Sequence, residues 1–296
     1  MASIIYYNTT LPEFEVYRPK TLDEVLRLKS KYGGDAMIIA GGTDLLVDLR
    51  MRLRKPKVLI DITGVDELRK LEYSEGKGLE IGAGVTLRAL ELNDIVRRKY
   101  PVLWSAIKVM ADAALRNRAT LVGNLCNASP AADTAPPLLT YKAKAEIASV
   151  RKRRIIDLKE FFVWVKRTVL KPDEVVTKVI VPEPPKGHSG EYYKAVRSVE
   201  DLALVGIAIL VANPDNPKER IVRLAYASVA PKPVIVDEVE KLFKQDKPLN
   251  QLIREAIEIV KRAVSPITDV RATKEYRMHI VEFMTAYLLK KYLKVR

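Results

Sequence analysis

The amino-acid sequence predicts an α+β protein of two units, and three observations support this prediction. Short apolar segments alternate with segments of helical periodicity in the first part of the chain. In the last third, three apolar segments are separated only by turns, which favours an antiparallel sheet, and two amphipathic segments follow them. Between these parts lies the proline-rich sequence PEPPKG at 182–187, which is typical of a linker. We therefore expect one domain at 1–182 and another at 183–296.

The composition indicates a globular protein. The chain has 296 residues, 48% of them hydrophobic, which is enough to bury a sizeable core. Its start shows no secretory signal, and its longest apolar run, at 202–212, is too short to span a membrane. We therefore expect a cytoplasmic protein without a membrane span. One cysteine, Cys126, excludes an internal disulfide, and two distant histidines leave no metal-ligand cluster.

The net charge of +14 raises the alternative of a basic nucleotide-binding or RNA-binding protein without redox activity. The basic residues are spread along the whole chain, however, and they are not interleaved with aromatic residues. A charged content of 30% with both signs mixed is more typical of a thermophile-like surface than of a groove for a polyanion. We therefore expect no nucleic acid as a partner.

The elements of the first part follow from local signals. Thr21 and Glu24 have the spacing of a capping box, and Gly33 has the place of a left-handed helix end. The expected elements are, in order, an extended segment at 13–18, a helix at 22–32, a strand at 36–40, a helix at 45–50, strands at 58–63 and 79–85, helices at 86–98 and 101–115, a hairpin of 143–150 with 155–158, and a strand at 175–181. For the second part we expect strands at 191–196, 202–212 and 220–229, and helices at 249–264 and 273–293.

Two stretches stand out from these elements. In the first, a strand runs directly into Gly41-Gly42-Thr43-Asp44 and then into a helix, an order that can aim free backbone N–H groups at a phosphate. An isolated Gly-Gly can equally be a plain turn, and neither the Rossmann fingerprint nor a P-loop is present. The second stretch, 115–141, holds three prolines and several small polar residues, so it should be neither a long helix nor a central strand. It is also too apolar for a solvated linker, so we expect it to be buried with its polar groups paired, in part by a ligand.

Taken together, AGGTDLL at 40–46 and TLVGNLCNASPAADTAPPLL at 120–139 resemble the two flavin-binding motifs of the medium subunits of molybdenum hydroxylases. This family includes the flavoprotein subunits of carbon monoxide dehydrogenase, xanthine dehydrogenase and aldehyde oxidoreductases. The sequence TDVRATKEYR at 268–277 is also similar to the family's entry into its last helix. The resemblance implies a two-part FAD-binding domain of the vanillyl-alcohol-oxidase (PCMH) type, with subdomains at about 1–57 and 58–182. It also implies a C-terminal domain with a three-stranded antiparallel sheet covered by helices.

The resemblance assigns roles to individual residues. The FAD would be bound non-covalently, because neither motif contains a histidine. Residues expected to wrap the FAD pyrophosphate are Ile38, Ile39, Ala40, Gly41, Gly42, Thr43, Asp44 and Leu45. The second clamp would be formed by Thr120, Gly123 and Asn124, and the polar spine of the cofactor would be bound by Ser129 and Asp133. Beside the isoalloxazine ring we expect Val176 and Lys194, whose charge would favour the anionic reduced flavin.

Some of these positions also have simpler interpretations. Asp133 could cap a following helix, and Lys194 could face water from a strand. Cys126 is expected to be a small buried residue and not a reactive thiol. The chain departs from the family pattern at Ala119 and Val122, where glycines are common, and each adds a Cβ atom near the expected phosphates.

The function implied by the resemblance is electron transfer by a flavoprotein subunit. The chain would take electrons from the [2Fe-2S] clusters of a small subunit, which receives them from a large molybdopterin-binding subunit, and would pass them from FAD to an acceptor. With one cysteine it cannot hold the clusters itself, so the assembly would be a heterotrimer or a dimer of heterotrimers. A stand-alone FAD-dependent oxidoreductase of the same fold remains an alternative. The substrate and the electron acceptor are not determined by this sequence.

Overall fold

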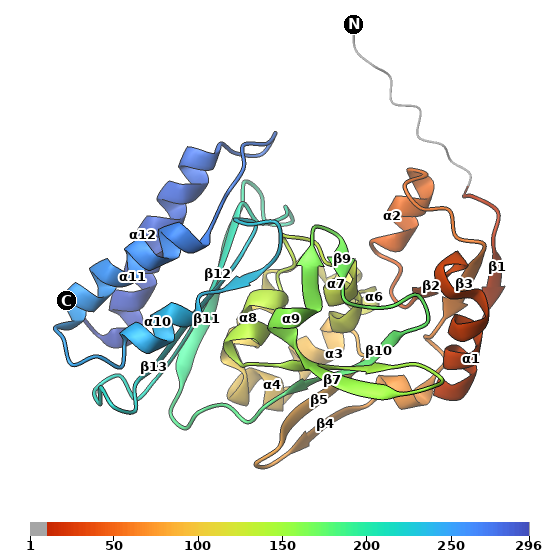
Figure 1. Ribbon diagram of the computed structural model, residues 1–296, viewed down its shortest axis with the longest axis horizontal. Coiled ribbons are helices and arrows are strands. Elements are labelled where there is room, and N and C mark those ends of the chain that lie inside the picture. The colour runs from red at the N-terminus through yellow and green to blue at the C-terminus, as the bar shows by residue number, and fades with distance from the viewer. Residues whose placement is uncertain (1–10, 296) are drawn as a thin grey trace, which may run out of the picture.

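The structure, a computed structural model, describes residues 11–295. The three larger of its four sheets lie with their helices side by side along the molecule (Figure 1). The sheet nearest the N-terminus is at one end, a larger sheet is in the centre, and the C-terminal sheet and helices are at the other end (Figure 1). Residues 1–10, part of the start that shows no secretory signal, lie outside the described residues.

The N-terminal sheet has three parallel strands in the order β1-β3-β2. Its elements are β1 (Glu15–Tyr17), α1 (Leu22–Tyr32), a short 3₁₀ turn (Gly33–Asp35), β2 (Ala36–Ile39), α2 (Leu45–Arg50) and β3 (Val58–Asp61). Thr21 caps α1 as expected, since its hydroxyl accepts a hydrogen bond from the backbone N–H of Glu24. The expected subdomain boundary near residue 57 falls before β3, but β3 pairs with β1 and β2. The first sheet therefore extends beyond that boundary, because β3 is its central strand.

The middle sheet is antiparallel, with five strands in the order β4-β5-β10-β6-β7. Its strands are β4 (Leu71–Ser74), β5 (Gly78–Gly82), β10 (Val175–Val181), β6 (Lys144–Ala148) and β7 (Arg153–Asp157). A 3₁₀ turn (Asp66–Arg69) precedes it, and the hairpin of β8 (Phe162–Trp164) and β9 (Arg167–Thr168) projects beside it. The helices around it are α3 (Leu87–Leu92), α4 (Asp94–Lys99), α5 (Pro101–Lys108), α6 (Ala113–Arg118), α7 (Leu121–Asn127), α8 (Ala135–Thr140) and α9 (Leu158–Phe161).

Two helices that the periodicity predicts as continuous are broken in the structure. The expected helix at 86–98 divides at Asn93, whose side-chain oxygen accepts hydrogen bonds from the N–H groups of Ile95 and Val96 and so starts a new helix. The expected helix at 101–115 ends at Lys108, and Asp112 caps α6 in the same way. In both places a short polar side chain offers the backbone an alternative partner, which apolar periodicity does not reveal.

The C-terminal sheet is antiparallel in the order β11-β12-β13-β14. The strands β11 (Ser189–Ala195), β12 (Val205–Ala212) and β13 (Ile221–Ala227) are the three that the sequence predicts, and β14 (Val234–Ile235) adds a short fourth. The helices that follow are α10 (Asp237–Leu242), α11 (Leu249–Ala263) and α12 (Lys274–Leu293). No described helix is long and apolar enough to cross a membrane.

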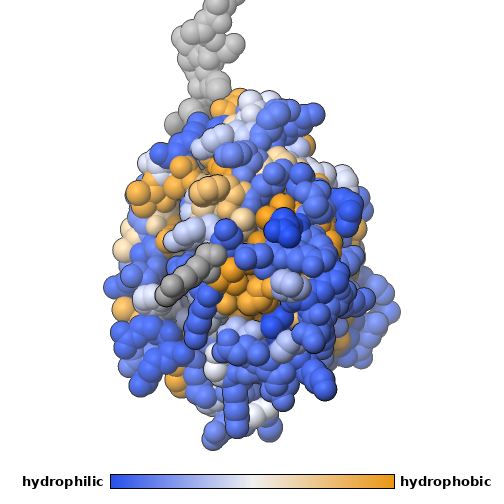
Figure 2. All heavy atoms as spheres, turned by 90° about the vertical axis from the view of Figure 1, so that its left-hand side faces the viewer, coloured by the Kyte–Doolittle hydropathy of each residue, from blue (hydrophilic) through white to orange (hydrophobic). Residues whose placement is uncertain are grey.

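Both faces of the C-terminal sheet are covered. Ile207 and Ile209 of β12 face a core shared with α10, α11 and α12, while Ala208 and Leu210 face the core of the first 182 residues. The sequence predicts helices on one face, and the structure adds α5 and α8 on the other. The outer end of the molecule, formed by α10 to α12, is mostly hydrophilic, with apolar side chains in smaller groups (Figure 2). The last third of the chain therefore packs directly against the middle part.

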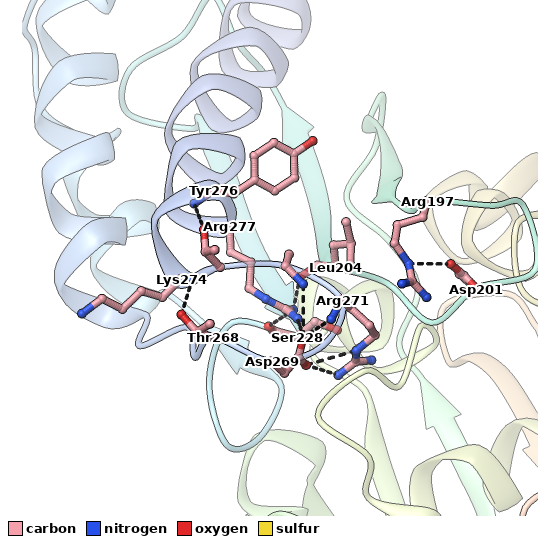
Figure 3. Close-up of polar contacts among 12 residues, drawn as sticks. Arg197, Asp201, Leu204, Ser228, Thr268, Asp269, Arg271, Lys274, Tyr276 and Arg277 are labelled. Carbon is pink, nitrogen blue, oxygen red and sulfur yellow. Dashed lines mark hydrogen bonds and ion pairs between the residues drawn. The ribbon is translucent and has the colours of Figure 1, made fainter. Parts of the chain in front are cut away.

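A buried arginine joins the start of α12 to the sheet. Arg277 is 1% exposed, and its guanidinium donates to the carbonyl oxygens of Leu204, at 2.6 Å, and Ser228, at 3.2 Å (Figure 3). The same group bonds the Asp269 carboxylate at 2.8 Å, and Arg271 holds that carboxylate from the other side. The entry sequence at 268–277 thus has a structural role, because it fixes the loop before α12 to the ends of β12 and β13.

Candidate cofactor-binding site

A cavity of ≈ 300 Å³ lies between the N-terminal sheet and the middle part of the molecule. It is lined by β2 and the residues that follow it, by α2, by residues from 119–127, and by the start of β10. The two sequence motifs, about 80 residues apart, therefore contribute to the walls of one cavity. Of the expected site residues, those that line it are Ile38, Ile39, Ala40, Gly41, Gly42, Thr43, Asp44, Leu45, Thr120, Gly123, Asn124 and Val176.

Gly41 and Gly42 are needed for different reasons. Gly42 has a φ of +74°, a backbone conformation that favours glycine. A Cβ atom on Gly41 would lie 2.1 Å from the carbonyl oxygen of Arg118 and 2.9 Å from the Cα of Ala119. Gly41 therefore lets the first motif pack directly against the backbone that leads into the second.

The turn after β2 presents unpaired backbone donors. The N–H groups of Gly41, Gly42, Thr43, Asp44 and Leu45 form no hydrogen bond with any other described residue. The Asp44 side chain does not cap α2 either. Because these residues line the cavity, their N–H groups are available to an anionic ligand such as a diphosphate.

Thr120 and Gly123 form the first turn of α7. The Thr120 hydroxyl accepts a hydrogen bond from the Gly123 N–H at 3.0 Å, and a Cβ atom on Gly123 would lie 2.7 Å from that hydroxyl oxygen. Glycine at this position thus keeps the helix cap intact. At the two departures from the family pattern, the side chains are packed into the protein, since Val122 is 4% and Ala119 9% exposed. Both residues also line the cavity.

Asn124 is oriented by a neighbour in the same motif. Its side-chain oxygen accepts a hydrogen bond of 2.6 Å from the Thr134 hydroxyl, which fixes the amide. The amide nitrogen then has no partner among the described residues and can donate into the cavity that Asn124 lines. A second amide, Asn127, accepts a hydrogen bond of 2.7 Å from Lys166 at the tip of the β8–β9 hairpin.

Asp44 places a carboxyl group next to the free N–H groups. Burial raises the pKa of Asp44 above its ordinary value, and the nearby positive charge of Lys166 and a hydrogen bond from Asn127 oppose this only partly. A carboxyl group with a raised pKa is more readily neutral, and a neutral carboxyl can donate to a phosphate oxygen instead of repelling it.

Three expected site residues lie outside the cavity lining. Ser129 accepts a hydrogen bond from the N–H of Ala131 and so shapes its own turn. Asp133 accepts hydrogen bonds from the Tyr192 hydroxyl at 2.7 Å and from the Lys194 ammonium at 3.0 Å. The side chains of Asp133 and Lys194 are each 4% exposed, so the positive charge of Lys194 is balanced within a buried pair.

The pair also decides between the simpler interpretations of these residues. Asp133 does not cap α8, whose N-cap is Thr134, and Lys194 does not face water. Burial raises the pKa of Asp133, and the positive charge of Lys194 and the hydrogen bond from Tyr192 oppose that rise. Lys194 also donates to the carbonyl oxygen of Val109, whose neighbour Met110 lines the cavity, so the pair is close to the lining.

Cys126 lines the cavity as a neutral thiol. The residue is partly buried, where a fully buried one was expected, and burial still raises the pKa of its thiol to about 12.

Other parts of the lining were not expected from the motifs, because the tertiary fold brings them in. These residues are Lys29, Ala36, Met37, Asp48, Arg54, Ile62, Ala83, Met110, Asn127, Leu170, Lys171, Glu174 and Val175. One of them has a signal in the sequence: Lys29 falls on the apolar stripe of α1, in line with the buried Leu22, Val25 and Leu26.

The geometry suits a dinucleotide with a central diphosphate. Ala36 and Gly41 both line the cavity and are five residues apart, a length of chain that spans up to roughly 16 Å, so the cavity continues beyond the free N–H groups. An elongated ligand can therefore place its anionic centre at the glycine turn while both of its ends remain in contact with protein.

Comparison with known proteins agrees with this geometry. Residues 12–184 match the family described as the FAD binding domain in molybdopterin dehydrogenase, and residues 191–292 match the carbon monoxide dehydrogenase flavoprotein C-terminal domain. The putative xanthine dehydrogenase FAD-binding subunit of Escherichia coli is 34% identical over 91% of this chain and 92% of its own length. The glyceraldehyde dehydrogenase medium chain of Sulfolobus acidocaldarius is 31% identical over 94% of this chain and 98% of its own.

A solved structure shares the whole fold. The carbon monoxide dehydrogenase of Hydrogenophaga pseudoflava contains a chain that superposes with a TM-score of 0.90, covering 96% of this chain and 99% of that one at 27% identity. With both family domains matched in order and with relatives of nearly equal length, the chain belongs to the FAD-binding medium subunits of the molybdenum hydroxylases.

Proposed function

We propose that this subunit receives electrons from the iron–sulfur clusters of a small partner chain and passes them from FAD to an external acceptor, in a cytoplasmic complex that also contains a large molybdopterin-binding chain. The observation that supports this is one cavity that residues of both flavin motifs line, where the backbone N–H groups of 41–45 have no partner among the described residues. The medium-chain names of its relatives support a complex of several chains.

Within this proposal, the residues of the cavity hold the cofactor. The N–H groups of 41–45 and the Asn124 amide bind the pyrophosphate, and Val176 contributes an apolar contact. When bound, FAD supplies the ability to accept and release electrons singly or in pairs, and the chain's own residues supply position and electrostatics.

The buried ion pair of Asp133 and Lys194 holds the second motif segment, which forms part of the cavity wall, against the C-terminal sheet. Asp133 lies in the motif segment and Lys194 lies on β11, so their ion pair fixes one to the other. We accordingly propose that 1–182 is the cofactor-binding unit and that 183–296 braces it.

The test uses the native complex, isolated through a tag on this chain. We expect the visible bands of a bound flavin, molybdenum and iron in the preparation, and reduction of the flavin by the substrate of the complex. This chain isolated alone should keep its flavin bands and show no reduction by that substrate.

The main competing outcome is reduction of the flavin in the isolated chain by a small substrate, without partner chains. That result would support a stand-alone oxidoreductase and contradict the proposed electron path. A chain that binds no FAD at all would contradict the proposed site itself.

A further inference from the structure

Lys29 is a positively charged residue that lines the cavity without a salt-bridge partner among the described residues. It extends from α1 and lines the cavity, yet no described carboxylate lies within salt-bridge distance of its ammonium group. Its Nζ donates to the carbonyl oxygens of Gly33, at 2.7 Å, and Ala36, at 2.6 Å. An ammonium group has three N–H donors, so one remains for a ligand in the cavity.

The position of Lys29 separates it from the diphosphate. Its partner Ala36 is the first residue of β2, and the free N–H groups begin at Gly41, two residues past the end of β2 and up to roughly 16 Å away. A diphosphate bound by the N–H groups of 41–45 therefore lies out of reach of Lys29. The ligand group that contacts Lys29 must therefore be one that is attached to one end of the diphosphate.

Hydrogen bonds and packing within the protein hold the cavity wall near Lys29 in place. The turn at 171–174 borders it, and Glu174 is held there by Arg154 through hydrogen bonds of 2.8 and 3.0 Å and by the N–H of Lys171. Pro172 lies 4.0 Å from the place a Cβ atom on Gly33 would occupy, so the turn touches the end of α1. Elsewhere in the lining, Met110 follows Val109, whose carbonyl oxygen accepts a hydrogen bond of 3.2 Å from Lys194 of the C-terminal domain.

We propose that Lys29 recognises the adenosine half of the dinucleotide, by donating to a ribose hydroxyl or an adenine ring nitrogen, and so makes the site selective for FAD over FMN. This inference rests on the proposed FAD site. An adenosine offers several acceptors for an ammonium group, and an adenosine bound beside the start of β2 leaves the flavin to the part of the cavity on the other side of the glycine turn. Burial lowers the pKa of Lys29, and the negative charge of Asp173, which forms no salt bridge with it, opposes this only partly.

The test compares Lys29→Met with Lys31→Met in the full chain after removal of flavin. Both variants remove one positive charge from α1, but Lys31 is exposed, with its ammonium over the Tyr32 ring, so it serves as the matched control. Flavin fluorescence follows FAD binding, and ADP and FMN are used as competitors. We expect Lys29→Met to weaken FAD and ADP about tenfold, as loss of a charged hydrogen bond does, with FMN unchanged, and Lys31→Met to leave all three unchanged.

Equal weakening of FMN and FAD, or no change in ADP, overturns the proposal. A second measurement needs no variant: hydrogen exchange of the peptide covering residues 29–39 in the wild-type protein. ADP should slow this exchange and FMN should not, and the reverse pattern would assign the Lys29 end to the flavin. A wild-type chain that binds no FAD would instead overturn the proposed site, so the two failures are distinguishable.

Discussion

In the proposed site, the ionisation of Asp44 is linked to cofactor binding. Its carboxyl group lines the cavity beside the free N–H groups, and burial already raises its pKa. A bound diphosphate adds negative charge nearby and raises that pKa further. Binding FAD therefore takes up a proton wherever Asp44 is ionised in the free protein.

The sign of the pH effect follows from this linkage. FAD affinity should fall as the pH rises through the pKa of Asp44 in the free protein, by up to about tenfold per pH unit. Asp44→Asn should remove this dependence and bind FAD more tightly than the wild type at high pH. The measurement is the FAD dissociation constant between about pH 5 and 9, with the exposed Asp66→Asn as the control. An unchanged pH profile in Asp44→Asn would contradict the role of this carboxyl group.

At the scale of elements, the contact between the two flavin motifs depends on the missing side chain of Gly41. Gly41→Ala would force the turn after β2 away from the carbonyl group of Arg118. We expect a loss of about 1–3 kcal/mol in the free energy of unfolding, as in other overpacked sites, together with FAD binding weakened at least tenfold.

The matched control is Gly34→Ala, because no atom lies within 4 Å of the Cβ position at Gly34. Chemical denaturation of the flavin-free chain measures stability, and fluorescence titration measures affinity. If Gly41→Ala binds FAD as the wild type does, then the contact between the motifs is not what shapes the cavity.

The elements differ in how well the sequence predicts them. Periodicity and caps give α1, α11 and α12 to within a residue or two of their ends, and the buried run around β12 is equally clear. Apolar periodicity gives the wrong result for the expected helix at 86–98, because the Asn93 side chain starts a second helix within it. The segment 115–141 is buried and free of long helices, as expected, but it contains the short helices α7 and α8, whose caps apolar periodicity does not show.

The sequence likewise predicts some residues of the candidate site and not others. Motif residues such as Gly42 and Asn124 line the cavity, because local backbone chemistry determines their place. The ion pair of Asp133 with Lys194 depends on the packing of β11 on the middle part, so the local sequence around either residue does not predict it. Met110 and Leu170 enter the cavity from elements that carry no flavin motif, so tertiary structure alone identifies them.

At the scale of the whole molecule, the ion pair of Asp133 and Lys194 connects the two domains. Lys194→Met would leave the Asp133 carboxylate buried without its counter-charge, which typically costs about 3–5 kcal/mol. We expect the unfolding free energy at pH 7 to fall by this amount, and Asp133→Asn combined with Lys194→Met to recover part of it.

The pH dependence gives an independent check. Without Lys194, burial leaves the pKa of Asp133 higher in the folded chain than in the unfolded chain, so the folded state binds the proton more tightly. The deficit of Lys194→Met should therefore shrink as the pH is lowered toward 5. A deficit that is small, or that grows on acidification, would show that the pair does not hold the domains together.

The second motif is completed by groups that are made later. Pro130 accepts a hydrogen bond of 2.8 Å from the N–H of Ser228, and Asp133 meets Tyr192 and Lys194. Because a ribosome delivers the N-terminal part first, the motif emerges before any of these partners exists. Maturation of the flavoprotein must therefore wait for the last third of the chain, and a nascent polypeptide halted near residue 185 would present an unfinished receptor for its prosthetic group.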